Sequence, residues 1–199
     1  MTVGRGATAM YNASNLDTDR QDIAASLGGD EAAFARLIRR HERAVANLLW
    51  RFVRQEAQCE ELVQETFVEA YFSLGRYRGE APLEHWLRRI ATRVGYRFWK
   101  QRSRQETHVP LADLDVAAPD GAGDAEAAGA AAHALLARLP PAERLVLTLM
   151  YFDDCQVKDI ARRMGWTRAM VKMRAYRARR RLKAIAGREH LLERLGWTS

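Results

Sequence analysis

The chain has 199 residues, and its 32 basic and 25 acidic side chains give a net charge of +7 at neutral pH. The N-terminus lacks the apolar core of a signal peptide, and no apolar run approaches the ~18 residues that cross a membrane. The sequence therefore excludes membrane insertion and predicts a cytoplasmic protein. Cys59 and Cys155 lie far apart, and the five histidines have no metal-ligand spacing. We expect no metal site and no other cofactor.

The charge is distributed unevenly along the chain. It is −2 over residues 1–30, +6 over 31–104, −6 over 105–134 and +9 over 135–199. Two basic blocks that flank an acidic one are typical of a nucleic-acid-binding protein with a separate acidic segment. No Ser/His/Asp set, glycine-rich phosphate loop or pair of carboxylates points to a catalytic centre, so we do not expect an enzyme.

The first block predicts helices throughout. Residues 1–16 are small and polar without periodicity, which predicts a disordered leader. A short helix is expected from Asp17 to Leu27, and the two glycines after it break the chain before Asp30 caps a second helix. The apolar positions of the second helix recur at helical spacing. They are Phe34, Leu37, Ile38, Val45, Leu48, Leu49 and Phe52.

A third helix is expected over residues 57–74, and its inward positions are Leu62, Val63, Phe67, Ala70, Tyr71 and Leu74. The loop GRYRGEA follows, and Pro82 suits the first turn of a fourth helix. The inward positions of this fourth helix are Leu83, Trp86, Leu87, Ile90, Ala91, Val94 and Phe98. No alternation typical of strands appears, so residues 17–104 are predicted to form one all-helical domain.

Residues 105–134 have a different character. They are rich in alanine, glycine and aspartate, contain two prolines, and include no lysine or arginine. This composition predicts a flexible acidic linker. About thirty residues can extend to ~100 Å, so two domains joined by this linker could contact well-separated sites on one DNA.

A second domain is predicted over residues 135–187, with a short amphipathic tail at 188–199. Two adjacent prolines precede a helix over 142–152, and the sequence from 157 to 183 reads VKDIARRMGWTRAMVKMRAYRARRRLK. Ala161, Gly165 and Val171 have the spacing of a helix-turn-helix. They would supply a small residue at the helix crossing, a left-handed turn residue and a buried anchor.

The second helix of this motif is strongly basic. Thr167 can cap it and offer a phosphate site at its N-terminus. The helix carries no acid as far as position 183, and its basic residues are Arg168, Lys172, Arg174, Arg177, Arg179, Arg180, Arg181 and Lys183. A basic helix alone is usually a solvated face or a surface for an acidic partner. Together with the spacing just described, it favours DNA binding.

The two blocks together resemble a compact bacterial sigma factor of the extracytoplasmic-function (ECF) group of the sigma-70 family. EELVQETFVEAY is similar to that family's polymerase-docking motif, and YRGEAPLEHWLRRIA is similar to its promoter-melting stretch. LARLPPAERLVLTLMYFDDCQVKDIARRMGWTRAMVKMRAYRARRRL follows its promoter-reading helix-turn-helix. The resemblance covers roughly residues 30–104 and 135–185. It implies an all-α protein in which 17–104 is sigma domain 2 and 135–187 is sigma domain 4.

This resemblance implies a function as well as a fold. The chain is expected to bind core RNA polymerase through the β′ clamp helices and the β flap. It should recognise the −35 and −10 elements of promoter DNA and support DNA melting and transcription initiation. Glu61, Gln64 and Glu65 share one helix face, which alone would indicate a solvated surface, and the resemblance makes them polymerase contacts. Whether an anti-sigma factor, a regulatory kinase or the tail at 188–199 controls the protein stays open.

The resemblance also implies two sets of DNA contacts. The −10 set is a loop that can hold an unstacked base, followed by arginines that can meet phosphates. It comprises Tyr77, Arg78, Gly79, Glu80, Arg88, Arg89, Arg93 and Arg97. The family usually has asparagine and aspartate where Arg93 and Arg97 stand, so this helix is more basic. The −35 set lies in the first turns of the basic helix. It comprises Thr167, Arg168, Lys172, Arg174, Tyr176 and Arg177.

One other function fits part of the sequence. A stand-alone dimeric helix-turn-helix transcriptional regulator would also need the basic C-terminal domain, and it would bind duplex DNA without polymerase. Such a regulator does not need the helical block at 17–104. That block therefore favours the sigma factor.

Overall fold

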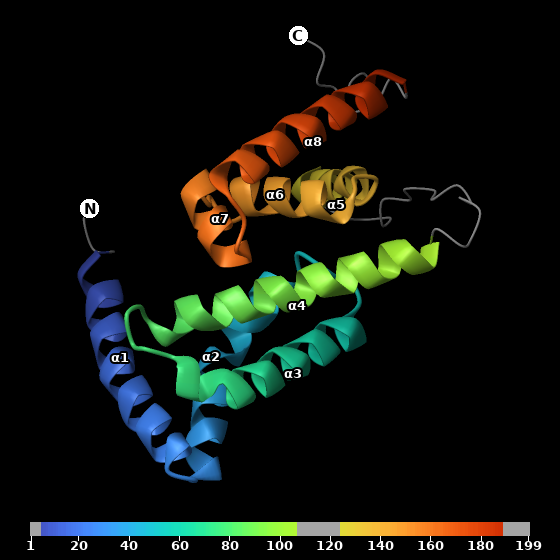
Figure 1. Ribbon diagram of the computed structural model, residues 1–199. Helices are drawn as coiled ribbons and strands as arrows, with labels where there is room; N and C mark the ends of the chain where they lie inside the picture. The colour runs from blue at the N-terminus through green and yellow to red at the C-terminus, as the bar shows by residue number, and fades with distance from the viewer. Residues whose placement is uncertain (1–4, 107–123, 189–199) are drawn as a thin grey trace. The chain divides into compact units, whose positions relative to one another are not determined.

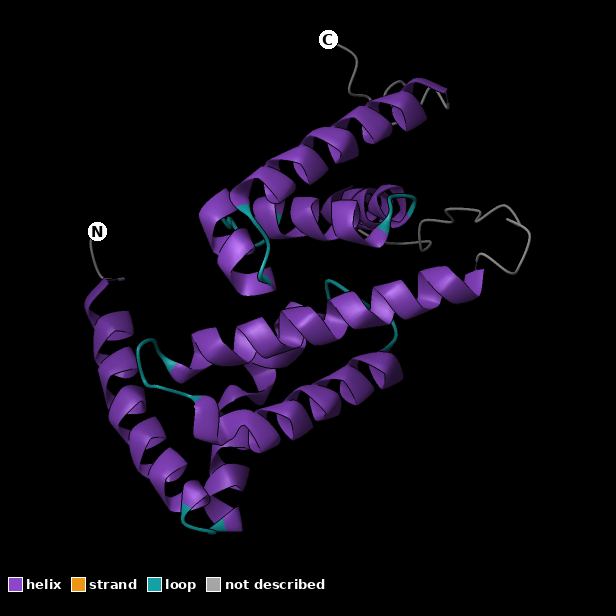
Figure 2. Ribbon diagram, viewed as in Figure 1, coloured by secondary structure: helices purple, strands orange, loops and turns teal. Residues whose placement is uncertain are grey.

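The structure is a computed structural model that describes residues 5–106 and 124–188 (Figure 1). Within these ranges the secondary structure is helical and contains no strand (Figure 2), which confirms the predicted all-α class. The chain divides into two compact units, Met1–Arg97 and Phe98–Ser199. This boundary falls inside a helix, earlier than the predicted end of the first domain at residue 104. We call the two parts the N-terminal unit and the C-terminal unit.

The N-terminal unit begins with α1 (Arg5–Leu27), α2 (Glu31–Leu49) and α3 (Glu56–Ser73). A short 3₁₀ turn (Leu74–Arg76) follows, and then α4 (Leu83–Glu106), whose residues 98–106 belong to the C-terminal unit. The start of α1 at Arg5 corrects the predicted leader, which was expected to be disordered as far as residue 16. Residues 5–16 contain no proline and a single glycine, so a helix nucleated over 17–27 can propagate towards the N-terminus at little cost.

The helices of the N-terminal unit form where the apolar periodicity predicted them. Asp30 caps α2, because its Oδ1 accepts a hydrogen bond from the Ala33 amide at 3.2 Å. The buried side chains of α2, α3 and α4 include Leu37, Val45, Leu48, Leu49, Leu62, Phe67, Leu87, Ile90 and Val94. Gly95 permits the closest approach, since a Cβ there would lie 2.4 Å from the ring of Phe52. The result is a packed support for the exposed faces of α3 and α4.

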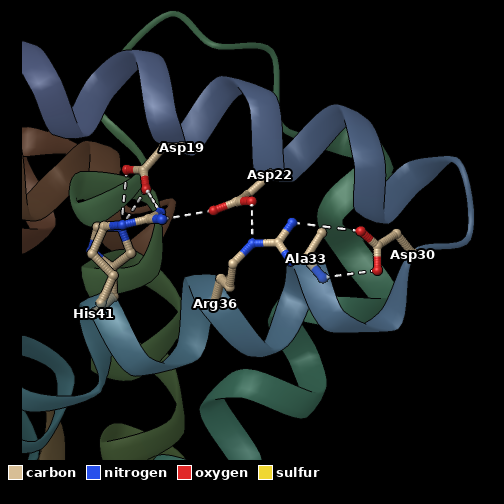
Figure 3. Close-up of polar contacts among 7 residues, drawn as sticks. Asp19, Asp22, Asp30, Ala33, Arg36 and His41 are labelled. Carbon is tan, nitrogen blue, oxygen red and sulfur yellow. Dashed lines mark hydrogen bonds and ion pairs between the residues drawn. The ribbon is translucent and has the colours of Figure 1, made fainter.

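A buried polar network fixes α1 to α2 (Figure 3). His41 Nε2 lies 3.0 Å from both carboxylate oxygens of Asp19, and Arg40 donates to Asp19 at 2.5 Å and to Asp22 at 2.6 Å. Arg36 donates to the other oxygen of Asp22 at 2.8 Å. Burial alone would raise the pKa of Asp22, but the hydrogen bonds from Arg40 and Arg36 outweigh it and lower that pKa. The network therefore makes α1 part of the folded unit.

The C-terminal unit contains α5 (Asp124–Ala137), α6 (Pro141–Tyr151), α7 (Val157–Met164) and α8 (Arg168–Arg188). Two predicted boundaries change here. The linker was expected over 105–134, but α4 continues to Glu106 and α5 begins at Asp124, because the run DAEAAGAAA has high helix propensity. Residues 107–123 of that linker, residues 1–4 of the leader and residues 189–199 of the tail lie outside the described residues.

The core of the C-terminal unit is built by α5, α6, α7 and α8. Leu136, Leu139, Leu147 and Ala178 form one buried cluster, against which Leu182 packs. Other buried side chains of this unit are Leu145, Val146, Leu149 and Ile160. This packing holds α8 by one side and leaves its other side available to a partner.

Candidate DNA and polymerase interfaces

The predicted helix-turn-helix is present in α7 and α8. Gly165 ends α7 with φ +68° and ψ +29°, the left-handed conformation expected from the sequence. The Trp166 amide donates to the Ala161 carbonyl at 2.9 Å, which closes the turn. Ala161 and Val171 are both buried, as a close crossing and an anchor require. The spacing of Ala161, Gly165 and Val171 therefore identified the motif correctly.

Thr167 caps α8. Its Oγ1 accepts a hydrogen bond from the Met170 amide at 3.2 Å, which satisfies one of the unpaired amides of the first turn. The other amides of this turn give the helix a partial positive charge at its N-terminus. Arg168 follows immediately and is exposed. The start of α8 thus has the chemistry of a phosphate-binding site.

The two sides of α8 differ in chemistry. Val171, Ala175 and Ala178 are buried against the unit. The exposed side chains on the opposite side or its edges in the first three turns include Lys172, Met173, Tyr176 and Arg177. This side presents an apolar centre between basic edges. Such a surface suits the major groove, where methyl groups and hydrogen-bond acceptors lie side by side.

The environment of Arg174 differs from that of the exposed residues around it. It is half-buried, and its guanidinium carbon lies 3.8 Å from the centre of the Trp166 ring, within the range of a cation–π contact. The helix-turn-helix therefore uses Arg174 to brace the turn against α8. Among the predicted −35 residues, Thr167, Arg168, Lys172, Tyr176 and Arg177 are exposed, and Arg174 stands apart from them.

The face of α3 that carries the predicted polymerase contacts is longer than the sequence indicated. Glu61, Gln64 and Glu65 are exposed, and they continue along the helix into Val68 and Phe72 at positions i+7 and i+11. The exposed fractions are 54% for Val68 and 82% for Phe72. We call these five residues the α3 face. Helical spacing from Glu61 could have identified both apolar members, because they continue the same side of the helix.

A groove of about 1040 Å³ lies between α2 and α3, and Gln64, Val68 and Phe72 of the α3 face line one side of it. On the α2 side it is lined at four-residue intervals by Phe34, Ile38, Glu42 and Ala46. Phe34 meets Tyr71 of α3 edge-on, with ring centres 5.0 Å apart. Tyr71 is half-exposed even with this contact, although the periodicity predicted it to point inward. The groove gives the α3 face an apolar flank.

The loop between α3 and α4 is held in shape by its own contacts. Tyr77 donates from its hydroxyl to the Ala81 carbonyl at 2.5 Å, and its ring centre lies 5.5 Å from that of Trp86. Burial and the negative charge of Asp19 raise the pKa of Tyr77. Gly79 has φ +70°, which favours glycine at the tip of the loop. The predicted −10 loop is thus a preformed element.

Two exposed charges flank Gly79 at the tip of this loop. They belong to Arg78 and Glu80, which lie 3.9 Å apart. Both side chains are more than three-quarters exposed, so their mutual attraction is weak in water. The tip can therefore exchange this contact for one with a ligand.

The predicted phosphate-binding arginines of α4 do not lie together. Arg89 and Arg93 are exposed on one side, while Arg88 donates to Glu84 at 3.2 Å. Arg97 turns towards α3, where it donates to Glu65 at 2.8 Å and also to Glu69. Burial disfavours the charged guanidinium, but these hydrogen bonds outweigh it and raise the pKa of Arg97.

The parts of the chain that the structure describes contain neither a candidate metal site nor a candidate membrane-spanning helix. Those residues contain no group of three or more His, Cys, Asp or Glu side chains that could hold a metal ion. None of the helices described is long and apolar enough to span a membrane.

Two family descriptions match the two units. The description "Sigma-70 region 2" matches residues 37–105, and "Sigma-70, region 4" matches residues 130–182. The chain is 30% identical over 172 residues to the ECF RNA polymerase sigma factor SigM of Mycobacterium tuberculosis, covering 85% of each chain. It is 29% identical over 175 residues to the RNA polymerase sigma-H factor of Pseudomonas aeruginosa, covering 82% of this chain and 91% of the relative.

A solved structure is also similar. CnrH, in complex with the cytosolic domain of CnrY, is 26% identical to this chain. The match has a TM-score of 0.53 and covers 85% of this chain and 97% of CnrH. Both sigma-70 regions are therefore present in the expected order, together with the helix-turn-helix. The chain belongs to the sigma-70 family and is a sigma factor of the extracytoplasmic-function group.

Proposed function

We propose that the two units divide the work of a sigma factor between them. The N-terminal unit docks on core RNA polymerase and binds the −10 element as the DNA melts, and the C-terminal unit reads the −35 element. The observation that carries this proposal is the pair of exposed helical faces, on α3 and on α8, held by two separate cores. The protein contributes recognition and positioning, and the polymerase carries out the chemistry.

The α3 face is the proposed contact with the β′ clamp helices. Glu61 and Glu65 offer carboxylates, Gln64 offers an amide, and these groups suit arginines on a partner helix. Val68 and Phe72 add an apolar end that a partner would cover. Exposed ion pairs contribute little affinity, whereas a buried aromatic side chain often dominates an interface. We therefore assign specificity to the polar half of the face and most of the affinity to Phe72.

The −10 element is proposed to contact the loop at 77–80 and the exposed side of α4. The loop tip offers Arg78, Gly79 and Glu80 to an unstacked base, and Tyr77 keeps the loop closed. Arg89 and Arg93 supply charge for phosphates, with Arg88 at the edge of the same helix. A loop that is shaped before binding loses less entropy when it captures a base.

The −35 element is proposed to lie against α8. Thr167 and Arg168 would bind phosphate at the helix start, while Lys172, Tyr176 and Arg177 would reach base edges. Arg174 can reach DNA only by leaving Trp166, so we place Lys172 ahead of it as a base-reading residue. The β flap of the polymerase is the proposed second contact of the C-terminal unit, as in the sigma factors that it resembles.

Control by another protein is a further part of this proposal. The relative CnrH is in complex with the cytosolic domain of CnrY. An anti-sigma factor that covers the α3 face would exclude polymerase, because both partners would need Phe72. The promoter DNA and the polymerase are in the bacterial cytoplasm, where we propose that this chain acts.

Run-off transcription tests the proposal. Core polymerase is incubated with a promoter library, with and without this protein, and the start sites are mapped. We expect defined start sites only when the protein is present, and no transcript from the protein alone. Equal start-site patterns in both reactions would contradict the sigma function. A stand-alone regulator would bind duplex DNA and fail to co-purify with core polymerase.

A further inference from the structure

Arg97 is the residue whose surroundings differ most from its expected role. Its Nη2 donates to Glu65 Oε1 at 2.8 Å and also to Glu69 Oε1. The side chains of Arg97, Glu65 and Glu69 are 48%, 47% and 36% exposed. One guanidinium thus bridges two carboxylates that lie one turn apart on α3. We call these three residues the Arg97 clasp.

Helix geometry explains why Arg97 leaves the basic side of α4. Arg89, Arg93 and Arg97 are four residues apart, and each step of four rotates the side chain by about 40° around the helix. The first two point to solvent. The third has rotated far enough to meet the carboxylates of α3. A guanidinium already bound to two carboxylates gains less from a phosphate than a free one does.

We infer that Arg97 is a positioning residue of the polymerase-docking surface, and that it does not bind DNA. It fixes the side chain of Glu65, which lies between Gln64 and Val68 on the α3 face, and it neutralises one of the two negative charges at that point. This inference rests on the proposed docking of the α3 face on polymerase. It separates two arginines of one helix by function, with Arg93 assigned to DNA and Arg97 to the polymerase interface.

The expected effect on the affinity for core RNA polymerase follows because the clasp restricts the side chain of Glu65 before binding. Immobilising one long side chain before binding removes an entropic cost equivalent to about a three- to tenfold change in affinity. The variant Arg97→Gln should therefore weaken binding of the full-length chain to core RNA polymerase by about three- to tenfold. The matched variant Arg93→Gln, one turn earlier on the same helix, should leave that affinity unchanged.

The salt dependence of DNA binding distinguishes the two arginines by a different measurement. The probe is a mixed-sequence single-stranded DNA of 30 bases, titrated with the full-length chain at several salt concentrations. Each lost phosphate contact reduces the steepness of the negative slope of log affinity against log salt by about 0.7. We expect this decrease for Arg93→Gln and no change for Arg97→Gln. An equal decrease for both variants would overturn the inference.

A charge exchange separates positioning from a general loss of stability. In the double variant Glu69→Arg/Arg97→Glu, the arginine introduced at position 69 can pair with Glu65 one turn before it and with the glutamate at position 97. The clasp then forms again with the charges at positions 69 and 97 exchanged. Polymerase affinity should return to within about twofold of the wild-type value, although position 97 now repels phosphate. Affinity that stays as low as in Arg97→Gln would overturn the inference.

The wild-type titration distinguishes the two levels of the proposal. If the wild-type chain does not bind core polymerase, the docking function fails, and the role of Arg97 fails with it. If the wild-type chain binds and Arg97→Gln binds equally well, only the positioning role is overturned. Should Arg97→Gln fail to fold, Glu69→Gln, which removes half of the clasp, is the substitute and should weaken polymerase binding in the same direction.

Discussion

Arg181 Nε lies 3.0 Å from Glu143 Oε2, so a basic residue of α8 is paired with the first turn of α6. Glu143 is buried, with 9% of its side chain exposed, whereas Arg181 is 57% exposed. The consecutive arginines at 179–181 appear in the sequence as one run of positive charge. The structure assigns one of them to the stability of the C-terminal unit.

The first prediction compares Arg181 with its neighbour. Arg181→Ala leaves the buried carboxylate of Glu143 without its partner and should lower the free energy of unfolding by about 1–2 kcal/mol. Arg180→Ala should leave stability unchanged and instead lower the salt slope of duplex DNA binding by about 0.9. Urea unfolding and binding titrations measure the two effects. Equal stability of the two variants would contradict the role of the Glu143 pair.

The second prediction concerns the two basic residues that flank Met173. Lys172→Ala should weaken binding to the preferred −35 sequence by about 1–3 kcal/mol without changing stability, because Lys172 is exposed. Arg174→Ala removes the contact with Trp166 and should lower the free energy of unfolding by about 0.5–2 kcal/mol. The fluorescence of Trp166 should change with it. A loss of affinity at a single base position in Arg174→Ala, with full stability, would return the base-reading role to Arg174.

The sequence predicted which side of each helix faces the core better than it predicted which helices pack against one another. Periodicity located α2, α3, α4 and α6 because one side of each packs on a core, and the Ala161–Gly165–Val171 spacing located the helix-turn-helix. Periodicity carries no information about which helix lies opposite a given face. The contact between Glu65 and Arg97, 32 positions apart, could therefore not be foreseen.

The differences at helix ends have a local cause. The start of α1 at Arg5 and the start of α5 at Asp124 both lie in segments without an apolar side, where amphipathic periodicity gives no signal. Backbone propensity alone extends those helices. Val68 and Phe72 were missed for a related reason, because exposed apolar residues on a mostly polar face do not belong to the core stripe that periodicity detects.

The third prediction uses the lowered pKa of Asp22. A carboxyl group with a lower pKa in the folded state adds stability above its unfolded pKa of about 3.9, and this stability is lost as the pH falls through the folded value. Stability should therefore decrease below about pH 4. Asp22→Asn should cost about 1–3 kcal/mol at pH 7, and the difference from wild type should shrink towards pH 2.

Asp17 supplies the control for that experiment. It lies on the same helix and pairs with Arg20 at 3.5 Å, but both side chains are more than 70% exposed. Asp17→Asn should change the free energy of unfolding by less than about 0.5 kcal/mol at any pH. Urea unfolding from pH 2 to pH 7 compares the three proteins. A constant difference between wild type and Asp22→Asn across this range would contradict the assigned role of Asp22.

The fourth prediction concerns Phe72, which is 82% exposed on the α3 face. A side chain with little contact in the free protein contributes little to folding, so Phe72→Ala should leave thermal unfolding unchanged. If polymerase covers the ring, the same variant should lose about 2 kcal/mol of affinity for core polymerase, the loss typical of an aromatic anchor. Phe72→Leu should retain part of that affinity because it keeps an apolar side chain. Competition between core polymerase and labelled protein gives both affinities. Wild-type affinity in Phe72→Ala would show that the docking surface ends before the apolar half of the α3 face.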